Sequence, residues 1–255
     1  MKNTANLVET LYNAYDQNQP ISKQSIHEEI GKLAAYEVQH LITEKKANVK
    51  EDKLIGYKIS LTSGETQQLF NSTTPLYGAL TQTSLSDGTI ELDTMLSPLI
   101  EIELMFIAKE ELSPADNEQS ILQKMSIAPG LEIPDSRFKD WFPKLTLGQV
   151  IADSAVAGKI VIGTPVQDLS YNQLENIKAE LLLDGESIAT GSSSEVLGNP
   201  VHSIKWLIDE LAKSGRMIEK GMIISSGTFI LPNKLQKGKY EVRFDSIGEV
   251  SLDVV

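Results

Sequence analysis

The residues most able to do chemistry in this sequence are three glutamates, Glu101, Glu103 and Glu132, which interrupt apolar segments. Apolar and acidic residues alternate over 99–107, a pattern typical of a strand that puts Glu101 and Glu103 on one face. Two carboxylates this close repel each other, and on a partly buried strand they are tolerated chiefly when a cation lies between them or one is protonated. With Glu132 as a third oxygen ligand, the set would suit Mg²⁺ or Mn²⁺.

The same alternation has a simpler explanation. Antiparallel strands commonly bury one face and leave the other in water, so Glu101 and Glu103 could be ordinary solvated side chains. Taken alone, two glutamates separated by one residue do not decide between these explanations. The motifs around them are needed to favour a metal site.

Lys58 is the second candidate for chemistry. It alternates with apolar residues over 54–63, where a strand should end in a tight polar turn. On an exposed strand face this lysine would be structural, because lysines are seldom buried. Buried beside the glutamates, it would be a cation that grips a carboxylate or moves a proton, because burial lowers a lysine pKa toward neutrality. The residue pattern leaves both options open.

Length and composition restrict the class of protein. We expect the 255 residues to form one domain, 1–255, with a helical N-terminal portion (1–50) followed by a mixed β core that carries the metal site (51–255). The absence of cysteine excludes disulfides, thiolate nucleophiles and Cys-based zinc sites. A formal charge of −12 argues against a nucleic-acid partner. The sequence lacks a long apolar segment, which predicts no membrane association and a cytoplasmic location.

Two N-terminal segments have the spacing of amphipathic helices. Apolar residues at helical intervals predict one helix over 5–16. Ser22 is expected to cap a second, longer helix whose apolar stripe runs from Ile26 to Ile42. On that helix, His27 and the two glutamates after it would lie on a solvated face.

The remainder of the chain is expected to be rich in strands. From Leu54 onward, short β-branched runs alternate with glycines and turns, and the tail over 222–255 has the same character. Helical spacing returns only at 117–125 and 201–213. Strands separated by helices without strict alternation predict an α+β fold, a curled mixed β-sheet flanked by helices.

Seven short motifs follow one another along nearly the whole chain. They are G-Y-K-I-S-L-T-S at 56–63, P-L-Y-G at 75–78, P-L-I-E-I-E at 98–103, L-E-I-P-D-S-R at 131–137, I-A-D-S-A at 151–155, V-L-G-N-P at 196–200 and S-G at 226–227. In content and order these motifs resemble the 2-keto-4-pentenoate hydratase and 4-oxalocrotonate decarboxylase family, within the fumarylacetoacetase superfamily.

The resemblance implies a fold, a site and a reaction. The fold would be the β-roll of the fumarylacetoacetase C-terminal domain, assembled as a homo-oligomer. Glu101, Glu103 and Glu132 would ligate Mg²⁺ or Mn²⁺, and Lys58 would be the active-site lysine. The substrate would be an unsaturated 2-oxo acid from aromatic compound catabolism, with the metal acting as a Lewis acid that stabilises the developing enolate. From that state either CO₂ leaves or water adds to the conjugated double bond.

Three positions depart from the family's pattern. Hydratases of the family usually carry an aspartate where this chain has Leu76, whereas the decarboxylases have an apolar residue there, so the resemblance favours a decarboxylase. Ser60 replaces a usual glycine and Ser154 a usual asparagine, which leaves a shifted substrate or a lost activity open. The alternatives are a 2-keto-4-pentenoate hydratase, a hydrolase of carbon–carbon bonds that would need a histidine base, and a non-catalytic member.

Five further residues are candidate substrate contacts. Arg137 could pair with a substrate carboxylate through two hydrogen bonds, or it could hold a neighbouring acid. Ser63 and Ser226 could donate hydrogen bonds to the substrate, although serines at such positions are also common turn residues. Ser136 follows the third glutamate and is a further candidate, as is Leu76.

Overall fold

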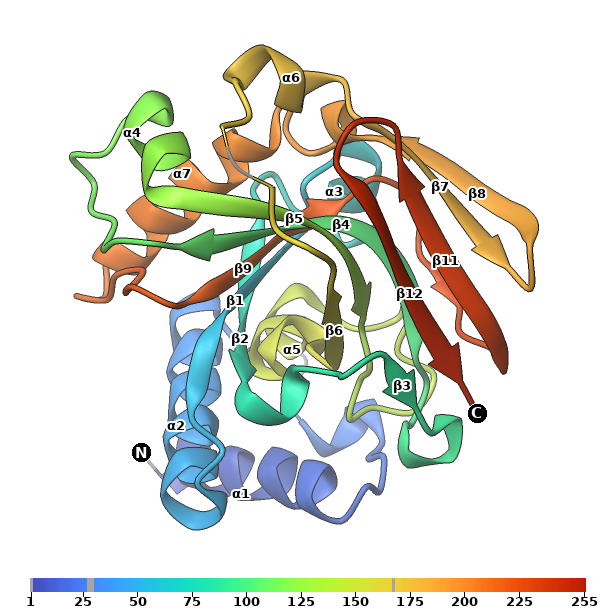
Figure 1. Cartoon of the computed structure of the whole chain (residues 1–255). Helices are drawn as coiled ribbons and strands as arrows, with labels where there is room; N and C mark the ends of the chain where they lie inside the picture. Colours follow the sequence, from blue (N-terminus) through green and yellow to red (C-terminus); the bar gives the residue numbers. More distant parts are fainter. Residues whose placement is uncertain (1, 27–29, 167) are drawn as a thin grey trace.

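Two mixed β-sheets packed against helices make up the fold of the computed structural model, which describes residues 2–26, 30–166 and 168–255 (Figure 1). The α-helices are α1 (Lys2–Asp16), α2 (Lys32–Lys50), α3 (Gly64–Leu69), α4 (Glu118–Lys124), α5 (Leu147–Ala152), α6 (Tyr171–Glu175) and α7 (Pro200–Ala212). The strands are β1 (Leu54–Ser60), β2 (Leu76–Thr81), β3 (Thr89–Ile90), β4 (Leu99–Ala108), β5 (Met125–Ile133), β6 (Lys159–Ile162), β7 (Lys178–Leu183), β8 (Glu186–Ser192), β9 (Ile223–Thr228), β10 (Asn233–Lys234), β11 (Gly238–Phe244) and β12 (Gly248–Val254). Short 3₁₀ turns lie at Lys23–Ser25, Gln82–Ser84, Leu92–Thr94, Ser154–Val156 and Ser193–Glu195.

The first sheet has the strand order β2-β1-β9-β4-β5-β6, with β10 paired to β4. Its β1 and β9 run parallel, and its other pairs are antiparallel. The second sheet has the order β3-β12-β11-β7-β8, and β11 and β12 of this sheet contact β5 of the first (Figure 1). This mixed, curled arrangement confirms the α+β fold predicted from the sequence.

Both faces of β4 are covered. Every residue from Ile100 to Phe106 is buried, including the glutamates that alternate with apolar side chains. The explanation of this alternation as a strand with one wet face is therefore wrong, because the curl of the sheet and the segments packed on it remove water from both sides.

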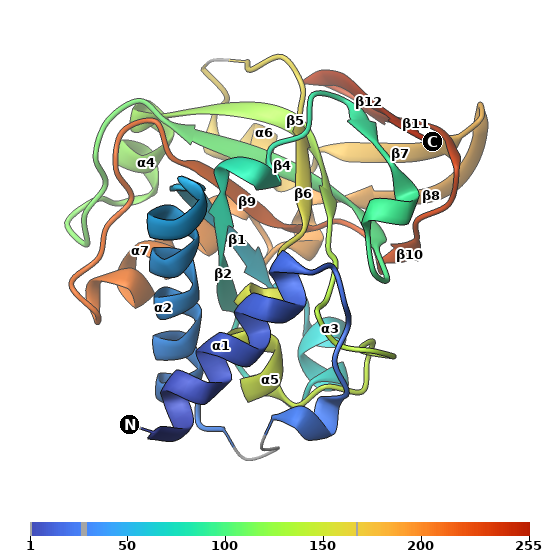
Figure 2. The same cartoon turned by 90° about the horizontal axis from the view of Figure 1, so that it is seen from below.

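Helix α2 packs against β2 of the first sheet and also against both α1 and α5 (Figure 2). The buried side chain of Gln39 in α2 connects these elements. Its amide nitrogen donates hydrogen bonds to Tyr77 O at 3.1 Å and to Ile151 O at 2.8 Å. These bonds tie α2 to β2 and to α5, so the N-terminal portion helps to place the strand beside Lys58.

The helix predicted to start at Ser22 is shorter than expected. Ser22 caps only the 3₁₀ turn Lys23–Ser25, and α2 begins at Lys32. The side chain of Gln149 donates hydrogen bonds to Lys23 O and Ile26 O, two carbonyls that a continuous helix would have used internally. The predicted solvated face at His27 to Glu29 lies outside the described residues.

The helix predicted over 5–16 is α1, which begins three residues earlier, at Lys2, and the two later helices are confirmed within one residue at each end. The segment 117–125 forms α4 and 201–213 forms α7, whose cap is Asn199. Pattern reasoning missed α3, α5 and α6, because five or six residues are too few to show a helical period. Each of these three begins after a serine or threonine whose side chain caps the helix: Ser63, Thr146 and Ser170.

A left-handed turn at Ser154–Val156 packs against β2. Its three residues have φ of 53°, 51° and 53°, a conformation that costs non-glycine residues roughly 1–2 kcal/mol each. Arg137 spans the turn, because its Nε lies 2.5 Å from Asp153 Oδ1 and its Nη1 donates to Ala157 O at 2.7 Å.

No helix in the described ranges combines the length and apolar character needed to cross a bilayer.

Gly78 provides the space into which the left-handed turn fits. It lies opposite Lys58 in the sheet, and a Cβ at this position would be 1.9 Å from Ser154 O. We expect Gly78→Ala to lower the free energy of unfolding by about 3 kcal/mol, the upper part of the range for overpacking. Urea denaturation measures the effect. Gly64→Ala is the control, since no heavy atom lies within 4 Å of that Cβ. Equal midpoints for the two variants would contradict this packing.

Candidate active site

The three glutamates meet on neighbouring strands. Glu101 on β4 lies directly opposite Glu132 on β5, and Glu103 follows two residues along the same face of β4. One carboxylate oxygen from each residue lies within 4.8 Å of the others. Their exposed fractions are 7%, 1% and 0%, so three acids share a site that excludes water.

Lys58 reaches this cluster from β1. Its Nζ lies 2.5 Å from Glu132 Oε1, and the lysine side chain is 1% exposed. The expectation that burial would bring its pKa toward neutrality is wrong. Burial does act in that direction, but the carboxylates of Glu132, Glu101 and Glu103 outweigh it and raise the pKa of Lys58. Lys58 therefore stays an ammonium ion.

One ammonium does not balance three carboxylates. Burial, together with the charge of Glu132, raises the pKa of Glu101 to about 8. Burial and the charges of Glu132 and Glu101 also raise the pKa of Glu103 well above its ordinary value. Oε2 of Glu132 is buried and accepts no hydrogen bond from any residue that the structure describes. A buried set of acidic oxygens with two uncompensated negative charges fits a divalent cation with hard oxygen ligands.

A small cavity, called the glutamate cavity below, adjoins Lys58, Glu101 and Glu103. Its volume is about 50 Å³, far below the several hundred cubic ångströms of a typical ligand pocket. Apolar side chains dominate the rest of its wall: Ile59, Leu61, Phe70, Pro134, Trp141, Phe142, Val150, Val156 and Pro232. Val156 places the left-handed turn at the wall. In such apolar surroundings each charge acts more strongly than it would in water.

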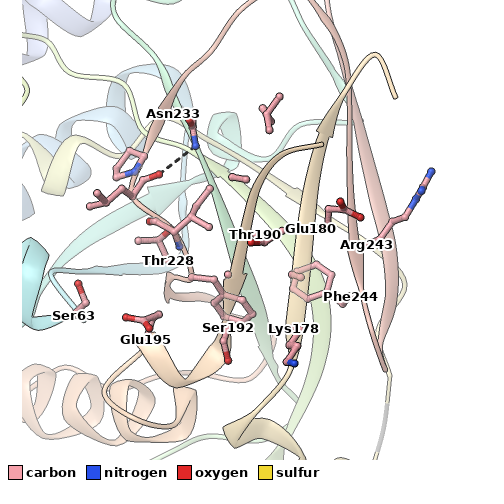
Figure 3. A pocket seen from close by; sticks show the side chains of 18 of the residues that line it. Ser63, Lys178, Glu180, Thr190, Ser192, Glu195, Thr228, Asn233, Arg243 and Phe244 are labelled. Atoms are coloured by element: carbon pink, nitrogen blue, oxygen red, sulfur yellow. Dashed lines mark hydrogen bonds between the residues drawn. The ribbon is translucent and has the colours of Figure 1, made fainter. Parts of the chain in front are cut away.

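A larger groove adjoins this cavity. It has a volume of about 1110 Å³ and shares Thr66, Thr228 and Pro232 with the cavity wall. Figure 3 shows Thr228 in this groove, with Lys178 and Arg243 contributed by the second sheet. The groove and the cavity at Lys58, Glu101 and Glu103 therefore border the same three residues.

The residues predicted to contact the substrate do not line the cavity beside Lys58, Glu101 and Glu103. Ser63 caps α3 and lines the groove, and Leu76 is buried on β2 opposite Ser60. Ser136 donates a 2.8 Å hydrogen bond to Asp153, and Ser226 Oγ is buried without a hydrogen-bond partner among the described residues.

Arg137 also binds its own chain, through Asp153 and Ala157, and it lines a different cavity. The structure therefore brings none of the five candidates to the wall of the glutamate cavity, and their substrate contacts stay predictions.

Pattern reasoning missed two groups that hold Glu103. Ser225 Oγ and Gly227 N both donate hydrogen bonds to Glu103 Oε2, the second at 2.9 Å. Strand alternation alone could not choose between the adjacent Ser225 and Ser226, because a register shift between β4 and β9 falls at this point. The glycine that follows the two serines was the available signal of a bulge.

Two histidines are described, and neither lines the glutamate cavity. His40 Nε2 is hydrogen-bonded to Tyr77 OH at 3.1 Å. His202 contacts Tyr171 OH at 2.9 Å and Leu197 O at 3.0 Å. Within the described residues there is thus no histidine base for the hydrolase alternative, and His27 lies outside them.

Comparison of sequences finds similar enzymes over almost the full chain. No protein-family model matches. The chain is 28% identical over 249 residues to a 2-keto-4-pentenoate hydratase from Paraburkholderia xenovorans, covering 95% of this chain and 91% of the relative. Decarboxylases are similar to the same degree: 4-oxalocrotonate decarboxylase from Pseudomonas sp. strain CF600 is 28% identical over 222 residues, covering 85% of this chain and 83% of that protein.

Comparison of structures finds a similar enzyme. A 4-oxalocrotonate decarboxylase from Pseudomonas putida G7, solved with magnesium and adipate, superposes with a TM-score of 0.90, at 25% identity, over 100% of this chain and 97% of that one. More distant solved structures of the fumarylacetoacetate hydrolase type share the fold alone. The chain is therefore similar over most of its length to lyases named 2-keto-4-pentenoate hydratase and 4-oxalocrotonate decarboxylase, and it has the fumarylacetoacetate hydrolase-type fold.

Proposed function

We propose that this chain is a divalent-metal-dependent decarboxylase of an unsaturated 2-oxo acid of the 4-oxalocrotonate type. The observation that carries the proposal is the buried cluster of Glu101, Glu103, Glu132 and Lys58 beside an apolar cavity. The solved decarboxylase with magnesium and adipate supports it.

Glu101, Glu103 and Glu132 would hold Mg²⁺ or Mn²⁺. Their carboxylates are close enough to converge on one ion, and the single ammonium group of Lys58 does not balance their negative charge. When bound, the ion would supply Lewis-acid stabilisation of negative charge on the 2-oxo oxygen of the substrate. The three glutamates would fix its position and leave the cavity side open to the substrate.

Lys58 would supply both charge and a proton. Because its pKa is raised, its ammonium group can hydrogen-bond an anionic substrate in the cavity. In the reaction, the carbon–carbon bond that joins the departing carboxylate to the rest of the substrate breaks. Its electron pair moves through the conjugated double bond to the 2-oxo oxygen, which takes up a proton to give the 2-hydroxydienoate product. The Nζ–H of Lys58 would donate that proton.

The apolar wall favours decarboxylation over hydration. Loss of CO₂ is assisted when the departing carboxylate is poorly solvated, and apolar side chains make up most of this cavity. Hydration needs a base that activates water. Leu76 is buried on the same face of the sheet as Lys58, so this position offers no carboxylate for that role. Hydration is the second candidate reaction, because hydratases are among the relatives similar in sequence.

The partner is a small-molecule 2-oxo acid that would enter through the groove. The cavity and the groove share wall residues, and the cavity must widen to admit a six-carbon acid. Assembly as a homo-oligomer and a cytoplasmic location stay predictions.

The first prediction concerns the reaction. With Mg²⁺, the protein should release CO₂ from 4-oxalocrotonate and should leave 2-hydroxy-2,4-pentadienoate unchanged, as followed by ultraviolet absorbance and CO₂ detection. EDTA should abolish turnover. Consumption of the dienoate without CO₂ would assign the hydratase activity instead, and no turnover of either acid would contradict both.

The second prediction concerns the ligands. Glu101→Gln and Glu103→Gln should lose the rise in melting temperature that Mg²⁺ causes in the unaltered protein, because a neutral amide is a poor ligand for this ion. Without metal both variants should melt at the same temperature as the unaltered chain or higher, since a neutral amide replaces a carboxyl group whose ionisation is disfavoured by burial and by the neighbouring glutamates. Glu186→Gln, on the exposed strand β8, is the control. A full Mg²⁺ response in either ligand variant would contradict the assignment.

The third prediction concerns pH. Without metal, the raised pKa of Glu101 means that the folded state binds more protons than the unfolded state between pH 4.5 and about 8. Stability should therefore fall as pH rises through this range. Mg²⁺ displaces these protons, so its stabilisation should be larger at pH 8 than at pH 5.5. Differential scanning fluorimetry with Mg²⁺ or EDTA at both pH values measures the difference, and an equal Mg²⁺ effect would contradict the linkage.

A further inference from the structure

The carboxylate of Glu103 is held by a feature of β9 that lies outside the predicted ligand set. Two donors meet on one of its oxygens, because Ser225 Oγ and Gly227 N both donate to Oε2. None of the described residues donates a hydrogen bond to the other oxygen, Oε1. Ser225 is fully buried and Glu103 is 1% exposed, so water does not compete for these bonds.

A β-bulge brings the two donors together. Ser225 lies opposite Met105, but Glu103 lies opposite Thr228, so β9 has one residue more than β4 between these pairs. The extra residue turns the N–H of Gly227 away from the strand ladder and toward the carboxylate. Gly227 has φ of 117°, and a Cβ there would be 2.4 Å from Thr62 Oγ1, so only glycine fits.

Ser225 also lies between the strand that carries Lys58 and the strand that carries Glu101 and Glu103. It pairs with Lys58 on β1 and with Met105 on β4, so β9 is the strand that joins the lysine to the glutamates. A hydroxyl at this point can orient Glu103 without touching the cavity, because Ser225 is absent from the cavity wall.

We propose that Ser225, together with the N–H of Gly227, is a positioning residue that fixes the rotamer of Glu103 and presents its Oε1 to the divalent cation. The inference rests on the proposed function, because the cation is the one assigned to the three glutamates. A glutamate has three rotatable side-chain bonds, and holding them before the ion arrives removes an entropy cost from binding. Groups that orient metal ligands in this way typically contribute about 10–100-fold in affinity.

Calorimetric titration of the full chain with MnCl₂ tests the proposal. Ser225→Ala should weaken Mn²⁺ binding by about 10–100-fold relative to the unaltered chain. Ser225→Cys keeps the volume but has a weak donor, so it should show a similar loss and covers the case in which the alanine variant fails to fold. The control is Ser193→Ala, a serine equally buried in the second sheet region, whose Oγ accepts from Ile177 N at 2.8 Å.

The outcomes separate this role from the proposed function. Weaker Mn²⁺ binding in both Ser225 variants, with unchanged affinity in Ser193→Ala, supports the positioning role even if all three variants melt at lower temperature. Unchanged Mn²⁺ affinity in the Ser225 variants, while the unaltered chain binds the ion, would overturn the role and leave the metal site intact. An unaltered chain that binds no Mn²⁺ would overturn the metal site, and the role of Ser225 with it.

Discussion

The structure depends on the burial of three carboxylates around a single ammonium. Glu101, Glu103 and Glu132 repel one another, and Lys58 offsets only part of their charge. Such a group is costly to remove from water unless its charge is balanced. The cavity wall beside the cluster is mainly apolar, and Lys58 is the one basic residue in it among those that the structure describes. The burial of the large surrounding core must therefore offset this cost. Uncompensated buried charge of this kind is characteristic of functional sites.

The curl of the first sheet makes the cluster geometrically feasible. Lys58 on β1 is separated from Glu132 on β5 by the strands β9 and β4, which amounts to three strand spacings of about 4.8 Å each in a flat sheet. A lysine side chain does not span that distance, yet its Nζ lies 2.5 Å from the glutamate. Curling of the sheet brings β1 and β5 toward each other. Gly78 and the left-handed turn at Ser154–Val156 fill the space beside Lys58 at close range.

Irregular backbone gives the site its detail. The bulge in β9 directs two donors to Glu103, and the turn spanned by Arg137 sets Val156 at the cavity wall. Both features are locally unfavourable, with one extra residue in a ladder and three non-glycine residues at positive φ. Their position next to the glutamates suggests that strain is retained where it shapes the cavity. A solved 4-oxalocrotonate decarboxylase shares this fold, and this chain is 28% identical in sequence to a hydratase and to a decarboxylase alike, so overall similarity does not separate the two reactions.

The sequence by itself determined the fold class, the main helices and strands, and the identity of the four charged residues. It did so because strand alternation and short motifs are local properties that survive without knowledge of the partner strands. Tertiary structure alone decided that Glu101 and Glu103 are buried and not solvated, that Arg137 holds Asp153, and that Ser225 and not Ser226 supports Glu103. These outcomes depend on the curl of the sheet and on a one-residue register shift, which arise from contacts between segments far apart in the chain.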